Sequence, residues 1–107
     1  GVARFGWPLA PLDEALGRVV VVPSGRQAPV VTLGLTRDAL GGVAAENLEH
    51  FFHSLAVASR AALHVDVLRG ANDHHRAEAA FKAAALALRQ AVTPTGGAAT
   101  PSTKGTL

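Results

Sequence analysis

The first third of the chain carries short apolar runs separated by turn residues, a pattern that is typical of β-strands. Residues 18–22 are mostly β-branched, which favours an extended strand. Residues 30–35 form a second apolar run, and a Pro-Ser-Gly sequence at 23–25 lies between the two runs as a turn former. The pattern therefore predicts a β-hairpin over residues 18–35.

Two later segments follow the helical period instead. Residues 46–62 carry an apolar stripe at a spacing of three and four, formed by Leu48, Phe51, Phe52, Leu55 and Ala58 or Ser59. Residues 72–92 repeat this spacing with smaller side chains, at Phe81, Ala84 or Ala85, and Leu88. We therefore expect one helix in each segment.

The remaining segments complete the order of elements. Residues 63–68 alternate, with His64 and Asp66 on one face of a predicted strand and apolar residues on the other. Residues 1–12 are expected to be extended, because prolines oppose a helix there, and residues 36–45 are expected to form a loop. Three strands, a helix, a strand and a helix predict an α+β two-layer sandwich with both helices on one face of a sheet.

Composition bounds the size and the partners of this unit. A chain of 107 residues is one small domain or part of one, which we place at residues 1–93. Residues 94–107, rich in Gly, Pro, Ser and Thr, are expected to be a flexible tail. The hydrophobic fraction is 49% but the aromatic fraction is 5%, so the core has few large anchors. A core of that kind often relies on a metal or on oligomerisation.

Charge and residue usage narrow the classes of function. The formal charge is +2 and no tract of Lys and Arg is present, so we expect no nucleic-acid partner. No apolar run reaches the ~18 residues that a membrane span needs, so we expect no membrane. The chain has no Cys, which fits a reducing, cytoplasmic location. The absence of Met, even at position 1, is typical of a processed chain or a piece of a longer one.

Candidate chemistry gathers at the start of the second predicted helix, which Asn72 or Asp73 can cap. His74 and Glu78 are one helical turn apart, and His75 precedes Glu78 by three residues, so all three side chains reach one end of the helix. Imidazole nitrogen together with carboxylate oxygen suits divalent transition metals. The spacing therefore predicts a metal site.

The same residues also suit a solvated helix start. Adjacent histidines are tolerated on a surface, and Glu78 with Lys82 is an ordinary pair at a spacing of four. The pattern His-His-x-x-Glu is less specific than the His-Glu-x-x-His of zinc proteases. Spacing alone leaves both interpretations open.

Longer stretches are more specific, and they resemble the imidazoleglycerol-phosphate dehydratase family of histidine biosynthesis. They are, in chain order, RFG at 4–6, PLDEAL at 11–16, SGR at 24–26, EHFF at 49–52, LHVDVLRGANDHHRAE at 63–78, FK at 81–82 and PSTKG at 101–105. The resemblance is to the second, C-terminal half of the family chain, and the residues at the start of the last helix look most like those of fungal members. It implies an α+β half-module of the ribosomal protein S5 domain 2-like type, in agreement with the order of elements above.

The resemblance also implies site residues. The family's second-half metal ligands fall on His50, His74, His75 and Glu78, with Mn²⁺ or a similar divalent ion as the cofactor. Its phosphate-holding residues fall on Arg4, Arg26, Lys82, Ser102 and Lys104. Guanidinium and ammonium groups suit a phosphate dianion, so this assignment is chemically sound. Asp13 and Glu14 are expected to serve a turn or a salt bridge and are assigned no catalytic role.

The implied reaction is the dehydration of imidazoleglycerol phosphate to imidazole-acetol phosphate. In this family two metal ions hold the substrate ring and favour its imidazolate form, which expels the adjacent hydroxyl. Members assemble as shells of 24 subunits, with active sites between subunits. A complete site would also need the missing first half or another copy.

Two other functions remain open at this point. One is a non-catalytic half-domain that binds metal or assembles but lacks a complete site. The other is a small α+β domain without metal. Metal content separates the last from the first two, and turnover with the missing half added separates the dehydratase from the non-catalytic half-domain.

Overall fold

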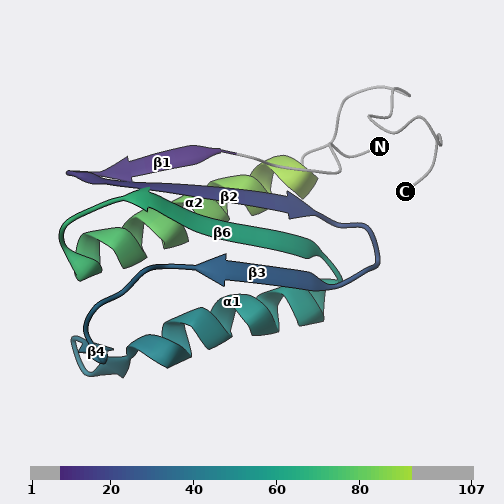
Figure 1. Cartoon of the computed structure of the whole chain (residues 1–107). Coiled ribbons are helices and arrows are strands. Elements are labelled where there is room, and N and C mark those ends of the chain that lie inside the picture. The colour runs from purple at the N-terminus through teal and green to yellow at the C-terminus, as the bar shows by residue number, and fades with distance from the viewer. Residues whose placement is uncertain (1–7, 93–107) are drawn as a thin grey trace.

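The computed structural model describes residues 8–92, which form a mixed sheet with two helices and one small hairpin (Figure 1). The elements in chain order are β1 Leu9–Leu12, β2 Ala15–Val22, β3 Ala28–Thr32, β4 Ala39–Leu40, β5 Val43–Ala44, α1 Ala45–Ser59, β6 Ala62–Arg69 and α2 Asp73–Val92. The predicted order of three strands, helix, strand and helix is confirmed, and β4 with β5 lies in the segment expected to be loop. The α+β class is therefore confirmed.

The strand order in the four-stranded sheet is β1-β2-β6-β3. Strand β6 pairs antiparallel with β2 over seven register pairs, from Leu16↔Arg69 to Val22↔Ala62, and parallel with β3. The predicted hairpin over residues 18–35 is therefore wrong, because β6 separates its two strands. The hairpin lies earlier, between β1 and β2, with Asp13 in the turn at a φ of 49°.

The reason for this order is visible in the burial of β6. Leu63 and Val65 are almost fully buried, and Val67 is nearly so, while the intervening His64 is exposed. A strand with an apolar inner face suits the interior of the sheet, where a strand pairs with it on each side and the helices cover that face; β2, whose Val19 and Val21 are also buried, takes the other interior place. A turn sequence at 23–25 is a local signal and does not encode which strands become neighbours.

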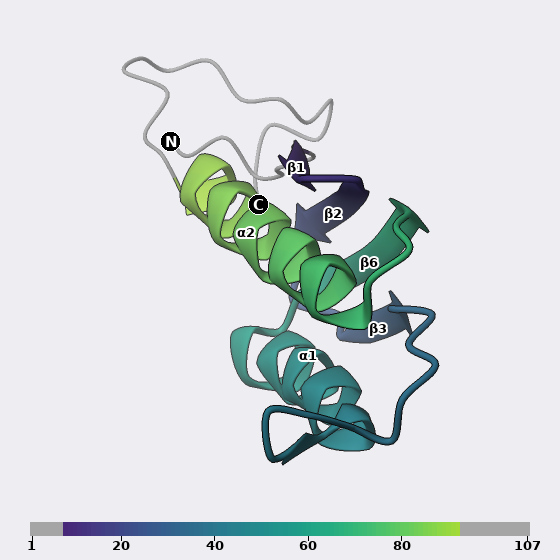
Figure 2. The ribbon, with the colours of Figure 1, turned by 90° about the vertical axis from the view of Figure 1, so that its left-hand side faces the viewer.

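Both helices cover the same face of the sheet (Figure 2). Helix α2 lies over β1, β2 and β6, and α1 lies over β3. The approach of α2 to β2 is close, because a Cβ on Gly17 would stand 2.8 Å from the carbonyl oxygen of Ala79. Small residues on both sides allow that distance. The buried face of α2 is formed by alanines, at Ala77, Ala79, Ala80, Ala83, Ala84, Ala87 and Ala91.

The helical stripes were predicted only in part. In α1 the buried residues are Phe52 and Ala56, whereas Phe51 is 48% exposed. The helix ends at Ser59, three residues before the predicted end, because Arg60 adopts a left-handed conformation. In α2, Phe81 lies half-buried against the core and close to the ring of Phe52, with 4.8 Å between centroids.

Candidate functional site

The start of α2 is held by two residues that flank the double histidine. The side-chain oxygen of Asn72 accepts a hydrogen bond from the backbone N–H of His75 at 3.1 Å, so Asn72 is the cap. The Asp73 carboxylate instead accepts bonds from the backbone N–H groups of Arg37, at 2.7 Å, and Thr36, at 2.8 Å. These bonds, the one from Arg37 first, lower the pKa of Asp73. Asp73 thereby ties the helix start to the segment that follows β3.

Arg76 makes a second connection at the same place. Its guanidinium donates to the carbonyl oxygens of Leu33 at 2.9 Å, Gly70 at 2.9 Å and Val67 at 3.3 Å. Gly34 has a φ of 65°, and a Cβ there would stand 2.5 Å from this guanidinium, so a side chain at this position would strain the backbone and displace Arg76. The ends of β3 and β6 and the first turn of α2 are thus joined by one side chain.

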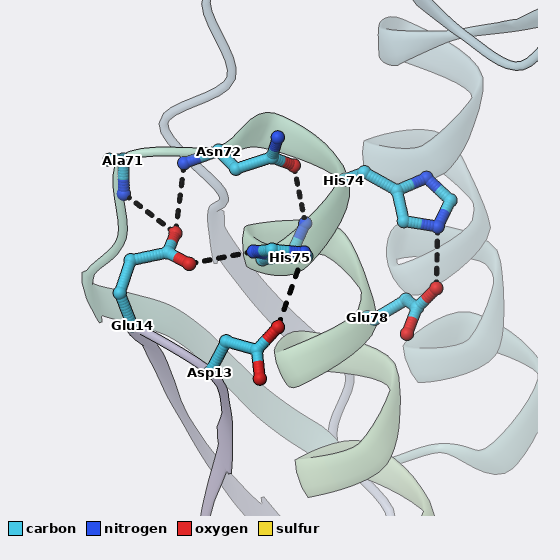
Figure 3. Close-up of polar contacts among 7 residues, drawn as sticks. All are labelled: Asp13, Glu14, Ala71, Asn72, His74, His75 and Glu78. Carbon is cyan, nitrogen blue, oxygen red and sulfur yellow. Dashed lines mark hydrogen bonds and ion pairs between the residues drawn. The ribbon is translucent and has the colours of Figure 1, made fainter.

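His74 and Glu78 form one pair of candidate ligands. His74 Nε2 lies 2.5 Å from Glu78 Oε1, one helical turn away (Figure 3). Both side chains line an apolar pocket of about 210 Å³ between the β4–β5 hairpin and the two helices. Leu40, Leu48 and Phe81 supply part of its wall. An imidazole and a carboxylate therefore stand together beside a small apolar hollow.

His75 projects to other partners. Its Nδ1 lies 2.6 Å from Glu14 Oε1, and its Nε2 lies 3.5 Å from Asp13 Oδ2 (Figure 3). Glu14 Oε2 also accepts the backbone N–H groups of Ala71 and Asn72, each at 2.9 Å. The turn between β1 and β2 is thus bonded to the start of α2.

This cluster shifts two pKa values in opposite directions. The hydrogen bond from the Asn72 backbone, followed by the contact with His75, lowers the pKa of Glu14 to about 2. The bond to Glu14 raises the pKa of His75, against an opposing effect of burial. The ion pair is therefore favoured over a wide range of pH in the metal-free chain.

The two adjacent imidazoles consequently belong to two separate groups, one with Glu78 and one with Glu14 and Asp13. His50, the fourth predicted ligand, lies exposed on α1, with its Nε2 3.5 Å from Ser54 Oγ. Within residues 8–92, no three His, Cys, Asp or Glu side chains gather closely enough to hold a metal ion. The predicted ligand set thus stays a prediction.

The predicted phosphate residues are spread along the molecule. Lys82 lies near the middle of α2, and its Nζ donates at 3.4 Å to the carbonyl oxygen of Pro11, close to the turn between β1 and β2. Arg26 is exposed in the turn after β2, at the opposite end of the sheet. The eight residues of β2 span roughly 26 Å, so Arg26 and Lys82 of one copy do not converge. Arg4, Ser102 and Lys104 lie outside the described residues.

Sequence reasoning missed three residues that shape this site. Glu14 was assigned only a turn or salt-bridge role, yet it contacts a predicted ligand 61 residues later in the chain. Asp73 was considered only as a cap, and Arg76 was assigned nothing. The position of Asp73 and Arg76 on either side of His74 and His75 is a signal in the sequence that could have pointed to these two residues, whereas Glu14 has no such signal.

Comparisons of the sequence with known families agree with the resemblance noted above. The family profile described as imidazoleglycerol-phosphate dehydratase matches residues 1–88. The imidazoleglycerol-phosphate dehydratase of Saccharomyces cerevisiae is 57% identical over 107 residues, which are 100% of this chain and 49% of that protein. The Candida glabrata protein of the same name is 55% identical, over 100% of this chain and 51% of its own length. The chain thus spans about half the length of the curated relatives it matches.

Solved structures give the same answer for the fold. The crystal structure of the Staphylococcus aureus imidazoleglycerol-phosphate dehydratase matches with a TM-score of 0.83 and 40% identity, over 87% of this chain and 54% of that one. The Pyrococcus furiosus protein, crystallised in complex with (S)-C348, matches with a TM-score of 0.83 and 40% identity, over 98% of this chain and 58% of that one. None of the helices within residues 8–92 has the length and apolarity to cross a membrane.

Proposed function

Because the chain belongs to the imidazoleglycerol-phosphate dehydratase family, we propose that it takes part in the dehydration of imidazoleglycerol phosphate to imidazole-acetol phosphate. It would do so as the equivalent of the second half of its longer relatives. The match over the whole chain at 57% identity supports this function. The proposal is assigned to particular residues by one observation: at the start of α2, His74 contacts Glu78 while His75 contacts Glu14 and Asp13.

We propose Mn²⁺ or a similar divalent ion as the cofactor, with His50, His74, His75 and Glu78 as ligands from this chain. The donor set fits, because imidazole and carboxylate groups stand at one helix end and His75 is oriented by a carboxylate, as metal-binding histidines commonly are. A bound ion would supply Lewis acidity toward the substrate's imidazole ring. Since this chain offers its donors in separate groups, a second half or a second copy would complete each site.

The chain's own residues would bind and orient the substrate. The apolar pocket beside His74 and Glu78 would keep water from the reacting ring. Lys82 would bind the phosphate, together with Arg4, Ser102 and Lys104. Arg26 lies at the other end of the sheet, so it would reach the phosphate of a site on a neighbouring copy.

The metal proposal is tested by loading the purified chain with Mn²⁺ and measuring bound metal after desalting. Changing His74 and His75 together to Ala should abolish stoichiometric binding of Mn²⁺. The control is His64→Ala, on the open face of the sheet, which is the face that the helices do not cover, and it should leave binding unchanged. Binding should weaken as pH falls, beginning above ~6.5, because the raised pKa of His75 lets protons compete with metal earlier than at a free imidazole. A folded chain that holds no metal would contradict the proposal.

A non-catalytic half-domain is the second candidate function. It is favoured by the separation of the donors and by the half-length coverage of the relatives. Turnover of imidazoleglycerol phosphate should be measured with the chain alone and with the first half of a relative added. Turnover in either sample supports the dehydratase. Metal binding without turnover in both samples supports the half-domain.

We also propose that several copies assemble, following the family pattern of 24 subunits, and that the protein acts in the cytoplasm. The assembly is supported by large apolar side chains that this chain leaves exposed, namely Leu9, Val30, Val43, Phe51, Val57, Leu68 and Leu86.

A further inference from the structure

The carboxylate of Glu14 binds three donors at once. Oε2 accepts the backbone N–H groups of Ala71 and Asn72, each at 2.9 Å, and Oε1 lies 2.6 Å from His75 Nδ1. The two backbone bonds fix the position and rotation of the carboxylate, because both donors belong to the short connection between β6 and α2. The carboxylate is therefore already fixed in position where it contacts His75 Nδ1.

The geometry determines which nitrogen of His75 carries the proton. A carboxylate that accepts two N–H groups is held in its ionised form, and an ionised carboxylate can only accept. Nδ1 must then be the donor, so in the neutral ring the lone pair lies on Nε2. Asp13 Oδ2 stands on the Nε2 side at 3.5 Å, a longer contact on a side chain that is 75% exposed. The ring is thus held through Nδ1, and its Nε2 has only the longer contact with the exposed Asp13 carboxylate.

His74 lacks this arrangement. Its partner Glu78 lies on the same helix, one turn away, and the two side chains are 61% and 50% exposed, against 31% for His75. Glu78 contacts His74 through Nε2, whereas Glu14 contacts His75 through the other ring nitrogen, Nδ1. The two adjacent histidines consequently differ in the ring nitrogen that contacts a carboxylate and in their exposure to solvent.

We propose that Glu14 is a positioning residue that fixes His75 in the Nδ1–H tautomer and presents Nε2 as its metal-binding atom. This inference rests on the proposed function for the role of His75 as a ligand. The turn between β1 and β2, whose residues are far from the double histidine in sequence, would thereby set the orientation of one of the two imidazoles.

The substitution Glu14→Gln gives a sharp test because it keeps the shape of the side chain. The single amide oxygen of the new side chain would accept the N–H groups of Ala71 and Asn72, which leaves its NH₂ group facing His75. Nδ1 must then accept, and the proton moves to Nε2. In the full chain, stripped of metal and held at a pH high enough for His75 to be neutral, ¹⁵N NMR of the imidazole nitrogens should show Nδ1–H in the wild type and Nε2–H in the variant. A His75→Gln sample assigns the signals.

The second measurement is Mn²⁺ affinity by calorimetric titration. Glu14→Gln should weaken binding by ~10–100-fold, the usual effect of losing a partner of a metal-bound histidine. The matched control is Asp66→Asn, which removes a carboxylate paired with Arg18 on the open face of the sheet and should change neither tautomer nor affinity. Glu14→Ala, which offers no group to Nδ1, should give a mixture of tautomers and a similar loss.

The outcomes separate this inference from the proposed function. A wild-type His75 in the Nε2–H form, or a Glu14→Gln variant with unchanged tautomer and affinity, would overturn the positioning role while metal binding stands. A chain that binds no Mn²⁺ would overturn the proposed function, yet the tautomer measurement on metal-free protein would still decide whether Glu14 positions the ring.

Discussion

At the scale of single residues, Lys82 gives the most direct test of the substrate's charge. Replacing it with Ala should weaken the binding of a phosphate-bearing substrate analogue by ~2 kcal/mol or more, which is about 30-fold in Kd, because a charge-assisted bond is lost. Calorimetric titration measures this change. Arg18→Ala, a cation removed from the open face of the sheet, is the control. Equal affinity of the Lys82 variant and the wild type would place the phosphate elsewhere.

The ion pair of Glu14 and His75 should stabilise the metal-free chain most within a limited range of pH. The pKa of Glu14 falls from 4.5 to about 2 on folding, so its contribution to stability is complete above ~4.5 and is lost as pH falls toward 2. The pKa of His75 is raised, so its contribution is complete below ~6.5 and declines as pH rises through the higher folded value.

Urea unfolding of the wild type and Glu14→Gln from pH 2 to 9 measures this effect. The difference in unfolding free energy should be greatest between ~4.5 and ~6.5 and should shrink on both sides. A difference that stays constant over the whole range would show that the ion pair does not contribute to stability.

Residue roles could be predicted where the chain itself brings the partners together. His74 and Glu78 are one turn apart, so helix geometry alone anticipates their contact, which the structure has. Glu14 and His75 meet only because β1 and β2 fold back beside the end of β6. No periodicity records that contact, and it was therefore missed.

At the scale of elements, the packing of α2 on β2 depends on Gly17. A methyl group there would stand 2.8 Å from a backbone oxygen of the helix, and backbone cannot turn aside as a flexible side chain can. Gly17→Ala should lower the unfolding free energy by ~1–3 kcal/mol. Val20→Ala, on the other face of the same strand, is the comparison. A Gly17 variant within ~0.5 kcal/mol of the wild type would show that the helix can move away.

The type of each main element could be predicted from sequence, but the neighbours of the strands could not. Apolar alternation at residues 63–68 correctly anticipates a strand with His64 outward. Strand β2 is predicted from a β-branched run at residues 18–22, and nothing in either pattern states that these two strands pair. Burial is consistent with the outcome, since β2 and β6 both have apolar inner faces and take the two interior places of the sheet.

At the scale of the whole molecule, we predict that the chain does not act as a monomer. Phe51 on α1 is 48% exposed, Leu86 on α2 is 39% exposed and Leu9 on β1 is 53% exposed, so apolar surface remains on both layers. Sedimentation velocity with Mn²⁺ and with chelator should show oligomers, with the larger species favoured by metal that is bound between copies. A stable monomer in both conditions with full turnover would contradict this.

The central place of β6 has a consequence for how the protein is made. During synthesis the ribosome releases β1, β2 and β3 first, but β2 and β3 have no strand between them until residue 69 has emerged. The β1–β2 hairpin can form early, whereas the rest of the sheet waits for a partner more than 30 residues further along the chain. Until then the edges of the β-branched strands are unpaired and open to pairing with other chains, so aggregation competes with folding at this stage.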